Sequence, residues 1–400
     1  MNMPLIRTLG CSLLFYVSTA LALPADNTLV LIDNDRSDYV IVLPAQATPP
    51  LQQAAAELQQ FLWEMTGVRL AIASDASPVT AHEILLGGTN RLSLLGVNIP
   101  WHDLGEEGYV LKTAGAHLLI AGSDKRGTLY GVYGLLEDHL GCRWFTPTVR
   151  TIPKTKRLAL PPLDEKRIPV LEYREPFVYD CFDGDWCCRN RMNSSTGRLE
   201  EKHGGKVRFG DGMFVHTFNT LLPPGEYFAK HPEYFSEIDG RRQGEFSQLC
   251  CTNDSVQEIV TRNVLAAIRR DPQAFVFSVS QNDWAQYCQC RRCQALAEKE
   301  GSQAGPLLLL VNHVAERVEK EFPGKAIETL AYQWSRKPPR TIRPRANVII
   351  RLCSIECSFS EPLTGSFPAN QAFAEDLEGW AQVSDRLWIW DYTTSFSHYL

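Results

Sequence analysis

The chain has 400 residues, of which 44% are hydrophobic and 10% aromatic. This composition can supply a large core, which excludes a wholly disordered or low-complexity chain. The 40 lysines and arginines and the 46 aspartates and glutamates give a net charge of −6, and neither sign forms a long run. We therefore expect no nucleic-acid partner. The length predicts two domains or one large one.

Residues 1–22 have the features of an export signal. Arg7 provides a positive start, an apolar run follows over 9–21, and Ala20-Leu21-Ala22 matches a small-residue cleavage site. A membrane anchor would need about 20 apolar residues in succession, and this shorter run is interrupted by serine and threonine. The sequence predicts a secreted or periplasmic protein that is cleaved after Ala22 and has no membrane span after cleavage.

Residues 23–165 show the pattern of a small α+β accessory domain. We predict strands over five β-rich runs, at residues 28–32, 39–43, 83–88, 109–113 and 117–121. Apolar residues at helical spacing predict one helix over 51–65, between Pro50 and Gly67, and a second over 129–136. This order of strands and helices predicts a small sheet with helices on one face. The proline-rich stretch 153–169 predicts the domain boundary.

Residues 166–400 alternate between strand and helix patterns. We predict strands over 173–179, 213–218, 275–280, 327–332, 348–352 and 387–392, and helices over 256–268 and 307–322. Repeated β-then-α units are typical of a TIM-type (β/α)8 barrel or of an open doubly wound sheet. We favour the barrel, because no Gly-x-Gly-x-x-Gly follows the first strand. Six candidates are fewer than the eight strands of a closed barrel, so we expect a barrel that is incomplete at its C-terminal end or unusually closed.

Carboxylates follow three of the predicted strands, where barrel enzymes place their catalytic groups. They are Asp283, Glu356 and Asp391. Hydrolysis of a glycosidic bond typically needs one carboxylic acid and one carboxylate. We predict Glu356 as the general acid, beside the apolar Ile355 and Phe359, and Asp391 or Asp283 as the base or nucleophile. Their separation is not readable from the sequence, so retaining and inverting mechanisms both stay open.

Side chains suited to sugar binding lie at the same strand ends. Aromatic rings stack on the C–H faces of sugars, while carboxylates and amides bind hydroxyl groups. The candidate substrate-binding residues are His216, Asn219, Asn282, Tyr332, Gln333, Trp334, Trp390 and Tyr392. We therefore predict a polysaccharide or glycan as the substrate.

Each catalytic candidate also has a structural interpretation. Asp283 could cap a turn, Glu356 could lie on a surface loop closed by a disulfide, and Asp391 could pair with Arg351. His216 could be an ordinary packed histidine. The functional interpretation therefore depends on whether the three carboxylates meet around one aromatic-walled hollow.

Eleven of the twelve cysteines follow the export signal, in a chain for which export favours disulfides. The densest group is Cys288, Cys290 and Cys293. Three thiolates could hold a structural zinc ion if a fourth ligand came from a distant loop. A disulfide such as Cys288 to Cys293, or free buried thiols, are the alternatives. We expect no cofactor to be required for catalysis.

Several motifs of the second domain resemble a family of secreted, largely bacterial proteins known as domain of unknown function 4838. They are His231-Pro232-Glu233-Tyr234-Phe235, Gln248-Leu249-Cys250, Ser278-Val279-Ser280-Gln281-Asn282-Asp283, the Cys-x-Cys-x-x-Cys group, Ala331-Tyr332-Gln333 and Trp390-Asp391-Tyr392-Thr393-Thr394. Two further motifs, Ala54-Ala55-Ala56-Glu57-Leu58 and Gly127-Thr128-Leu129-Tyr130-Gly131-Val132-Tyr133, resemble the N-terminal domain shared by α-glucuronidases and β-hexosaminidases.

The resemblance implies a barrel related to glycoside hydrolases, acting on polysaccharide or glycan. The β-hexosaminidases carry an adjacent Asp-Glu pair at a strand end, whereas Asp283 is followed here by Trp284. This departure disfavours acetamido-assisted catalysis, and separated carboxylates resemble an α-glucuronidase arrangement more closely. The alternatives are a non-catalytic carbohydrate-binding or scaffold protein with the same fold, and, with less support, a metal-dependent hydrolase that uses the cysteine group.

Overall fold

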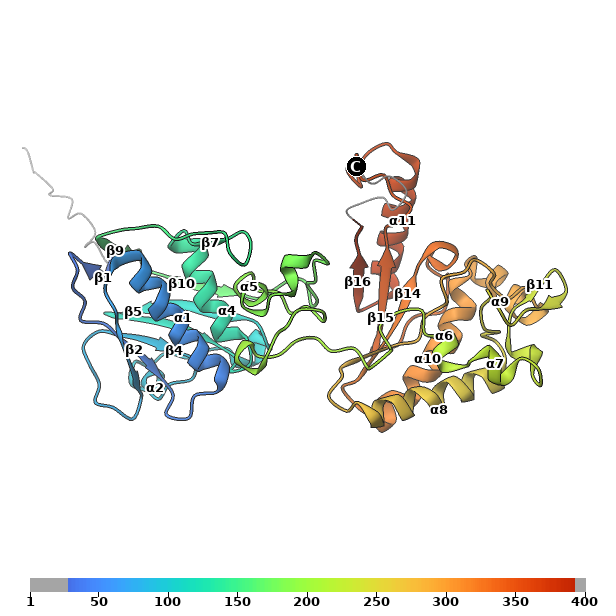
Figure 1. Ribbon diagram of the computed structural model, residues 1–400, viewed down its shortest axis with the longest axis horizontal. Helices are drawn as coiled ribbons and strands as arrows, with labels where there is room; N and C mark the ends of the chain where they lie inside the picture. The colour runs from blue at the N-terminus through green and yellow to red at the C-terminus, as the bar shows by residue number, and fades with distance from the viewer. Residues whose placement is uncertain (1–27, 393–400) are drawn as a thin grey trace, which may run out of the picture.

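The computed structural model describes residues 28–392 and folds them into two α/β units joined by a linker (Figure 1). Residues 1–22, where the export signal is predicted, lie outside the described range. Across the described residues, no helix combines the length and apolar character needed to cross a bilayer. Each unit has its own sheet and its own buried core.

The first unit is built on a six-stranded mixed sheet with strand order β10-β5-β6-β4-β2-β3. Its strands are β2 (Val40–Leu43), β3 (Ala71–Ser74), β4 (Glu83–Leu86), β5 (Tyr109–Ala114), β6 (His117–Gly122) and β10 (Asp164–Arg167). Two antiparallel pairs lie outside it: β1 (Leu29–Asp33) with β9 (Arg157–Leu160), and β7 (Arg143–Trp144) with β8 (Arg150–Thr151). The five strands predicted for this region correspond to β1, β2, β4, β5 and β6.

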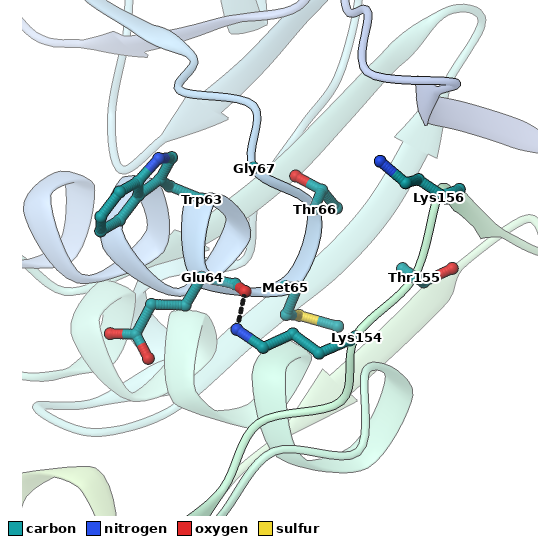
Figure 2. Close-up of a pocket in the computed structure, with 8 residues that line it drawn as sticks. All are labelled: Trp63, Glu64, Met65, Thr66, Gly67, Lys154, Thr155 and Lys156. Atoms are coloured by element: carbon teal, nitrogen blue, oxygen red, sulfur yellow. Dashed lines mark hydrogen bonds between the residues drawn. The ribbon is translucent and has the colours of Figure 1, made fainter.

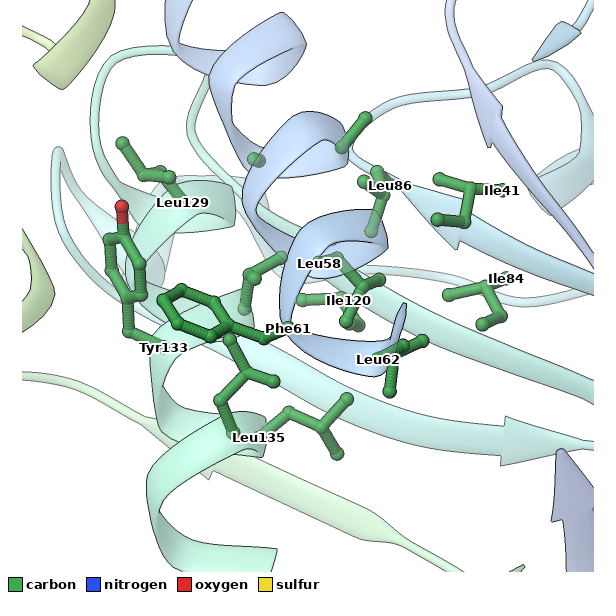
Figure 3. Close-up of a cluster of buried hydrophobic side chains, with 14 of the residues drawn as sticks. Ile41, Leu58, Phe61, Leu62, Ile84, Leu86, Ile120, Leu129, Tyr133 and Leu135 are labelled. Atoms are coloured by element: carbon green, nitrogen blue, oxygen red, sulfur yellow. The ribbon is translucent and has the colours of Figure 1, made fainter. Parts of the chain in front are cut away.

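Two longer helices pack on one face of this sheet, in agreement with the sequence pattern. Helix α1 (Pro49–Thr66) begins with two prolines and ends at Gly67, which has the left-handed backbone of a C-terminal cap. Helix α4 (Gly127–Gly134) continues into the π-helical turn η1 (Leu135–His139). Figure 3 shows Phe61 of α1 packed beside Tyr133 of α4, over side chains of the sheet.

The opposite face of the sheet is also covered. Short helices α2 (Arg91–Leu94) and α3 (Trp101–Leu104) contribute Leu92 and Leu104 to a second cluster with Leu85 and Leu119 of the sheet. This cover was not expected from the sequence, because four-residue helices are too short to show apolar periodicity. The accessory unit is therefore a sheet with both faces buried.

A glycine-rich motif lets α4 lie very close to the sheet. A Cβ atom at Gly127 would lie 2.4 Å from the carbonyl oxygen of Gly108, and one at Gly131 would lie 2.8 Å from Cγ2 of Ile120. Both distances are well below ordinary carbon contact. Larger residues would push α4 away from β5 and β6, which accounts for the Gly-Thr-Leu-Tyr-Gly run.

The first unit extends beyond the boundary expected near residue 165. Strand β10 pairs with β5, and the buried cysteines Cys181, Cys187 and Cys188 belong to the first core. They come from η2 (Tyr179–Phe182) and α5 (Gly184–Arg189), which η3 (Glu201–His203) follows. Part of the range predicted as barrel, 166–400, thus packs on the accessory unit.

The second unit is a four-stranded parallel sheet with order β13-β14-β15-β16. The strands are β13 (Val276–Ser278), β14 (Ala326–Ala331), β15 (Val348–Cys353) and β16 (Leu387–Trp390). Its longer helices are α8 (Asp254–Arg270), α9 (Arg291–Glu300), α10 (Ala304–Glu321) and α11 (Pro368–Val383). The short elements are α6 (Phe218–Leu221), α7 (Pro224–Tyr227), η4 (Pro232–Tyr234), β11 (Glu237–Ile238), β12 (Arg241–Arg242) and η5 (Gln333–Ser335).

The described residues form an open sheet, and no closed barrel is present among them. Four of the six predicted strands exist, as β13 to β16, whereas 173–179 and 213–218 are not strands. In the first segment Pro176 has no N–H to donate to a strand partner. In the second, His216 has a φ of 53°, which an extended strand does not accommodate.

The segment before His216 nevertheless lies beside β13. The N–H of Gly210 donates to the carbonyl of Val276 at 2.9 Å, and the N–H of Ser278 donates to the carbonyl of Met213 at 3.0 Å. Phe209 and Val276 also form an isolated parallel bridge. This irregular segment occupies the place of a neighbouring strand without regular pairing.

Two residues of the segment between β10 and η2 connect the two units. Glu172 accepts a hydrogen bond from Nε1 of Trp388 in β16 at 3.0 Å and pairs with Arg386. Two residues later, Arg174 donates to Glu107 of the first unit at 2.6 Å. This segment therefore bridges the two units.

Candidate active site at the carboxyl end of the parallel sheet

The carboxyl ends of β14, β15 and β16 meet in one small cluster. Leu330, Tyr332 and Cys353 are buried there. Four partly buried side chains pack against them, namely Val215, Ile355, Trp390 and Tyr392. Because parallel strands end at the same edge, residues from distant parts of the chain become neighbours. All three predicted catalytic carboxylates come from loops that leave this edge.

Asp283 is bound directly to this cluster. Its Oδ1 atom accepts a hydrogen bond from the Tyr332 hydroxyl at 3.1 Å and lies 4.0 Å from Nε2 of His216. The carboxylate side chain is 62% exposed, so a ligand can reach it. The ring of His216 is oriented from its other side, where Nδ1 lies 2.8 Å from the carbonyl oxygen of Gln281.

The loop that carries Asp283 is held by buried amides. Oε1 of Gln248 accepts from the backbone N–H of Asn282 at 2.8 Å, and Nε2 of Gln248 donates to its carbonyl at 2.9 Å. The Asn282 side chain donates to Asn219 and to the Ser247 carbonyl, at 2.9 and 2.8 Å. Asn282 and Asn219, predicted as sugar ligands, thus bind each other in the structure.

Tyr332 is a donor to Asp283 rather than a free surface ring. Burial, and then the negative charge of Asp283, raise the pKa of the Tyr332 hydroxyl well above its usual range. Gln333, whose φ is 50°, donates from Nε2 to the same hydroxyl oxygen at 3.1 Å. Nε1 of Trp334 donates to the carbonyl of Trp284 at 3.1 Å. These contacts join the loop after β14 to the loop after β13.

Glu356, the predicted general acid, is paired with a cation. Its Oε2 atom lies 2.5 Å from a guanidinium nitrogen of Arg336, and Nε of Arg336 also binds Asp376 at 2.7 Å. The side chain of Glu356 is 42% exposed. Cys353 and Cys357 on either side of it are free thiols, so its loop is not closed by a disulfide. The surroundings of Glu356 are therefore charged rather than apolar.

Asp391 is placed by a serine of the neighbouring strand end. Its Oδ1 atom accepts from the hydroxyl of Ser354 at 2.9 Å, and that serine oxygen accepts the backbone N–H of Tyr392 at 3.1 Å. The rings of Trp390 and Tyr392 stack at 5.9 Å with an interplanar angle of 9°. Arg351, the alternative partner of Asp391, pairs with Glu328.

The electrostatic coupling at this edge links two carboxylates through one hydroxyl. The charges of Asp283 and Glu356 both contribute to the raised pKa of Tyr332, after burial. Burial is also the largest cause of the raised pKa of Tyr392, with further contributions from Tyr332 and Asp283. Such coupling acts over short separations. Tyr392 packs in the same cluster as Tyr332, and Tyr332 donates to Asp283, so these three residues belong to one site.

A separate cavity lies in the first unit (Figure 2). It has a volume of about 570 Å³ and is lined by the end of α1 and by residues 154–156. Lys154 donates to the backbone carbonyl of Glu64 across it. The lining contains no cluster of catalytic side chains, so we place the candidate active site at the sheet edge.

A group of four buried cysteines lies next to the Asp283 loop. Cys250 joins the three thiols singled out in the sequence, and the four Sγ atoms lie within 4.8 Å of one another. All eleven cysteines of the described range are free thiols. Four sulfur ligands in this arrangement are the donor set of a structural zinc site, with no position left for a reacting water.

Parallel α/β sheets place their functional side chains at the carboxyl edge of the strands, where the three carboxylates lie here. The chain belongs to the family described as domain of unknown function (DUF4838), whose model matches residues 144–400. Residues 33–135 match the model of the glycosyl hydrolase family 67 N-terminus. Both resemblances inferred from the sequence are confirmed.

Individual relatives are glycoside hydrolases. An alpha-glucuronidase of Hypocrea jecorina is 31% identical over 196 residues, which are 48% of this chain and 20% of the relative. The structure of a family GH115 4-O-methyl-alpha-glucuronidase with specificity for decorated arabinogalactans matches with a TM-score of 0.50 and 12% identity, over 90% of this chain and 54% of that one. This likeness supports the fold. The chain spans a fifth of the curated relative and about half of the GH115 structure.

A GH20 beta-N-acetylhexosaminidase of Streptomyces coelicolor A3(2) is more distant. It matches with a TM-score of 0.45 and 13% identity, over 92% of this chain and 75% of that chain.

Three residues of the site were missed from the sequence. Gln248 holds the Asp283 loop, Arg336 pairs with Glu356, and Ser354 places Asp391. Gln248 could have been found, since it lies in the same short motif as Cys250, the fourth member of the cysteine group. No sequence pattern marks Arg336 or Ser354 as part of the site, because the residues that they contact depend on how the loops cross at the sheet edge.

Proposed function

We propose that this chain is part of a secreted or periplasmic glycoside hydrolase that acts on a polysaccharide or glycan. The proposal rests above all on Asp283, an accessible carboxylate that Tyr332 and His216 position at the carboxyl edge of a parallel sheet. The similarity of residues 33–135 to the glycosyl hydrolase family 67 N-terminus supports the same class.

The sugar would bind along the edge formed by the loops after β13 to β16. The stacked rings of Trp390 and Tyr392 offer an aromatic surface, and Gln333 offers an amide close to Asp283. Such rings pack on the apolar face of a pyranose, and the amide binds its hydroxyl groups. His216 faces the same carboxylate, and because its Nδ1 donates to the Gln281 carbonyl, its Nε2 can accept a hydrogen bond from a sugar hydroxyl.

Hydrolysis would use two of the carboxylates. One protonates the glycosidic oxygen as its bond to the anomeric carbon breaks, and the other takes a proton from the attacking water or bonds to that carbon itself. We assign the base or nucleophile to Asp283 or Asp391. Glu356 is the proposed acid, and it would have to separate from Arg336 before it can carry a proton to the leaving oxygen.

A carbohydrate-binding protein without catalysis is the second candidate. The observation that favours it is the ion pair between Glu356 and Arg336, because a carboxylate held by a guanidinium is not free to reach a glycosidic oxygen. Such a protein would retain an oligosaccharide uncut on the same aromatic surface.

A glycan library screened against carboxamide variants tests the proposal. We expect Glu356→Gln, and Asp283→Asn or Asp391→Asn, to lower turnover by about 10²-fold or more. Glu361→Gln is the matched control, since Glu361 is an exposed carboxylate of the same loop as Glu356. Unchanged turnover in all three variants would reject hydrolysis at this site, and binding without cleavage by the unmodified chain would favour the second candidate.

Export is tested separately. Expression of the full chain in a bacterium, followed by N-terminal sequencing of the exported product, should give a chain that starts at residue 23. A cell-retained product that still carries Arg7 would contradict the proposed location.

A further inference from the structure

The four-cysteine group lies where two distant segments of the second unit meet. Cys250 lies between β12 and α8, whereas Cys288, Cys290 and Cys293 lie at the start of α9. All four side chains are buried, with exposures of 8% or less. A group this enclosed cannot take a substrate, so its role has to be structural.

The spacing of the sulfur atoms fits a metal rather than a disulfide. Sγ of Cys250 lies 3.6 Å from Sγ of Cys290 and 3.9 Å from Sγ of Cys293. A tetrahedral zinc ion with Zn–S bonds of about 2.3 Å separates its sulfur ligands by about 3.8 Å. A disulfide requires about 2 Å between the two sulfurs.

Donors around the group suit thiolate ligands. The backbone N–H of Glu237 points to Sγ of Cys288 at 3.4 Å, and a guanidinium N–H of Arg242 lies 3.7 Å from the same sulfur. The hydroxyl of Thr252 lies 3.1 Å from Sγ of Cys293. Hydrogen bonds and a nearby positive charge offset the excess negative charge of four thiolates around a divalent ion.

We propose that Cys250, Cys288, Cys290 and Cys293 bind a structural zinc ion, which fastens residues 234–252 to the loop that carries Asp283. Binding forms four Zn–S bonds and releases the thiol protons to solvent. The zinc fits no catalytic role, because the four sulfurs fill its tetrahedral positions.

The zinc would act on the candidate active site through hydrogen bonds between residues 234–252 and the loop that carries Asp283. Gln289 donates from its backbone N–H to Glu237 at 2.7 Å, and Gln248 binds both backbone groups of Asn282. Gln248 lies two residues before Cys250. A zinc ion bound to Cys250 would therefore also fix the position of the Gln248 side chain, which binds the Asp283 loop. This second step rests on the proposed function of Asp283, whereas the metal site does not.

The metal content of the purified full chain tests the site directly. We expect about one zinc ion per chain by elemental analysis, after incubation with zinc under reducing conditions. Cys250→Ser should lower the zinc content by about tenfold or more. Cys251→Ser is the matched control, because this neighbouring buried thiol donates to the Leu249 carbonyl, as a serine hydroxyl can.

The unmodified chain decides the question even if Cys250→Ser does not fold. Its denatured, unreduced mass should equal that of the all-thiol sequence. A mass lower by two hydrogen atoms for each disulfide, with zinc below about a tenth of an equivalent, would overturn the proposal, as would stoichiometric iron in place of zinc.

Hydrogen exchange tests the fastening step without any sugar. Removing the metal with a chelator should speed exchange in peptides covering 281–293 by about tenfold or more, while peptides from α1 stay unchanged. Unchanged exchange over 281–293 in a chain that has lost its zinc would overturn the fastening of the loop. Neither measurement depends on hydrolysis, so failure of the metal site is distinguishable from failure of the proposed function.

Discussion

Arg351 and Glu328 form an ion pair inside the parallel sheet, with Nε and Oε1 2.7 Å apart and side-chain exposures of 4% and 0%. They lie on the neighbouring strands β15 and β14. Arg351 also donates to the carbonyl of Phe214 at 2.6 Å, and its guanidinium lies 4.8 Å from the ring centre of Trp390. One buried cation thus ties two strands to the irregular segment beside β13 and to the aromatic edge of the site.

Breaking this pair should be costly. Glu328→Gln leaves the buried charge of Arg351 without its partner, and we expect the free energy of unfolding to fall by about 3–5 kcal/mol. The measurement is urea denaturation followed by tryptophan fluorescence. Glu319→Gln, which breaks the exposed pair with Arg345, should cost less than about 1 kcal/mol. Equal losses in the two variants would contradict this view of the pair.

The core of the first unit gives a second prediction. Phe61 is fully buried, whereas Trp63 on the same helix is 43% exposed. Phe61→Ala should lower the free energy of unfolding by about 3–5 kcal/mol. Trp63→Ala should cost much less, because its ring already contacts water. Thermal denaturation of both variants provides the comparison, and a larger loss for Trp63→Ala would refute it.

The hydroxyl of Tyr332 should matter for turnover more than for stability. A hydrogen bond to a charged group contributes about 1.5–3 kcal/mol, so Tyr332→Phe should lower turnover by about tenfold or more if Asp283 is catalytic. Steady-state kinetics measures the effect. Tyr39→Phe removes a hydroxyl that donates to Ala116 in the first unit and should leave turnover unchanged. Full activity of Tyr332→Phe would argue against Asp283 as the reacting group.

Asp185 predicts a pH effect on stability. Hydrogen bonding to His203, at 2.7 Å, holds the pKa of this carboxyl well below its usual 3.8, against the opposing effect of burial. Because the folded-state pKa is the lower one, the native state binds fewer protons than the unfolded state. The stabilisation is therefore present above about pH 4 and is lost as the pH falls further.

Comparing the native chain with Asp185→Asn isolates this contribution. Urea unfolding between pH 3 and pH 7 should show a deficit in the variant at pH 7 that shrinks towards pH 3. A deficit of constant size across this range would mean that the interaction does not depend on the charge of Asp185.

Much of the fold is predictable from local pattern. Helix α1 follows from apolar spacing between a proline and a glycine. Strands β14 and β15 are mostly apolar and buried along their whole length, as parallel strands are, with one charged residue in each. The segment over 213–218 has the same β-rich composition, yet Gly212 and His216 take positive φ values of 67° and 53°. Amino-acid composition does not reveal that a single residue takes a left-handed backbone conformation. The strand predicted over 213–218 was therefore wrong.

The candidate site is predictable in its carboxylates but not in their partners. The rule that parallel strands end at one edge selects Asp283, Glu356 and Asp391. Whether Glu356 is surrounded by apolar side chains or by Arg336 depends on how two loops cross, which no spacing in the chain encodes. For the same reason Cys250 was not assigned to Cys288 and its neighbours.

The segment between β10 and η2 limits how the two units of the molecule can reorient. Glu172 binds Trp388 in the last strand of the second unit, and Arg174, two residues later, binds Glu107 of the first unit, so this segment holds the two units against each other. Any hinge motion would have to break a charged contact first. A polymer that binds across both units would therefore contact two units held in one relative position, with little closure of one unit onto the other.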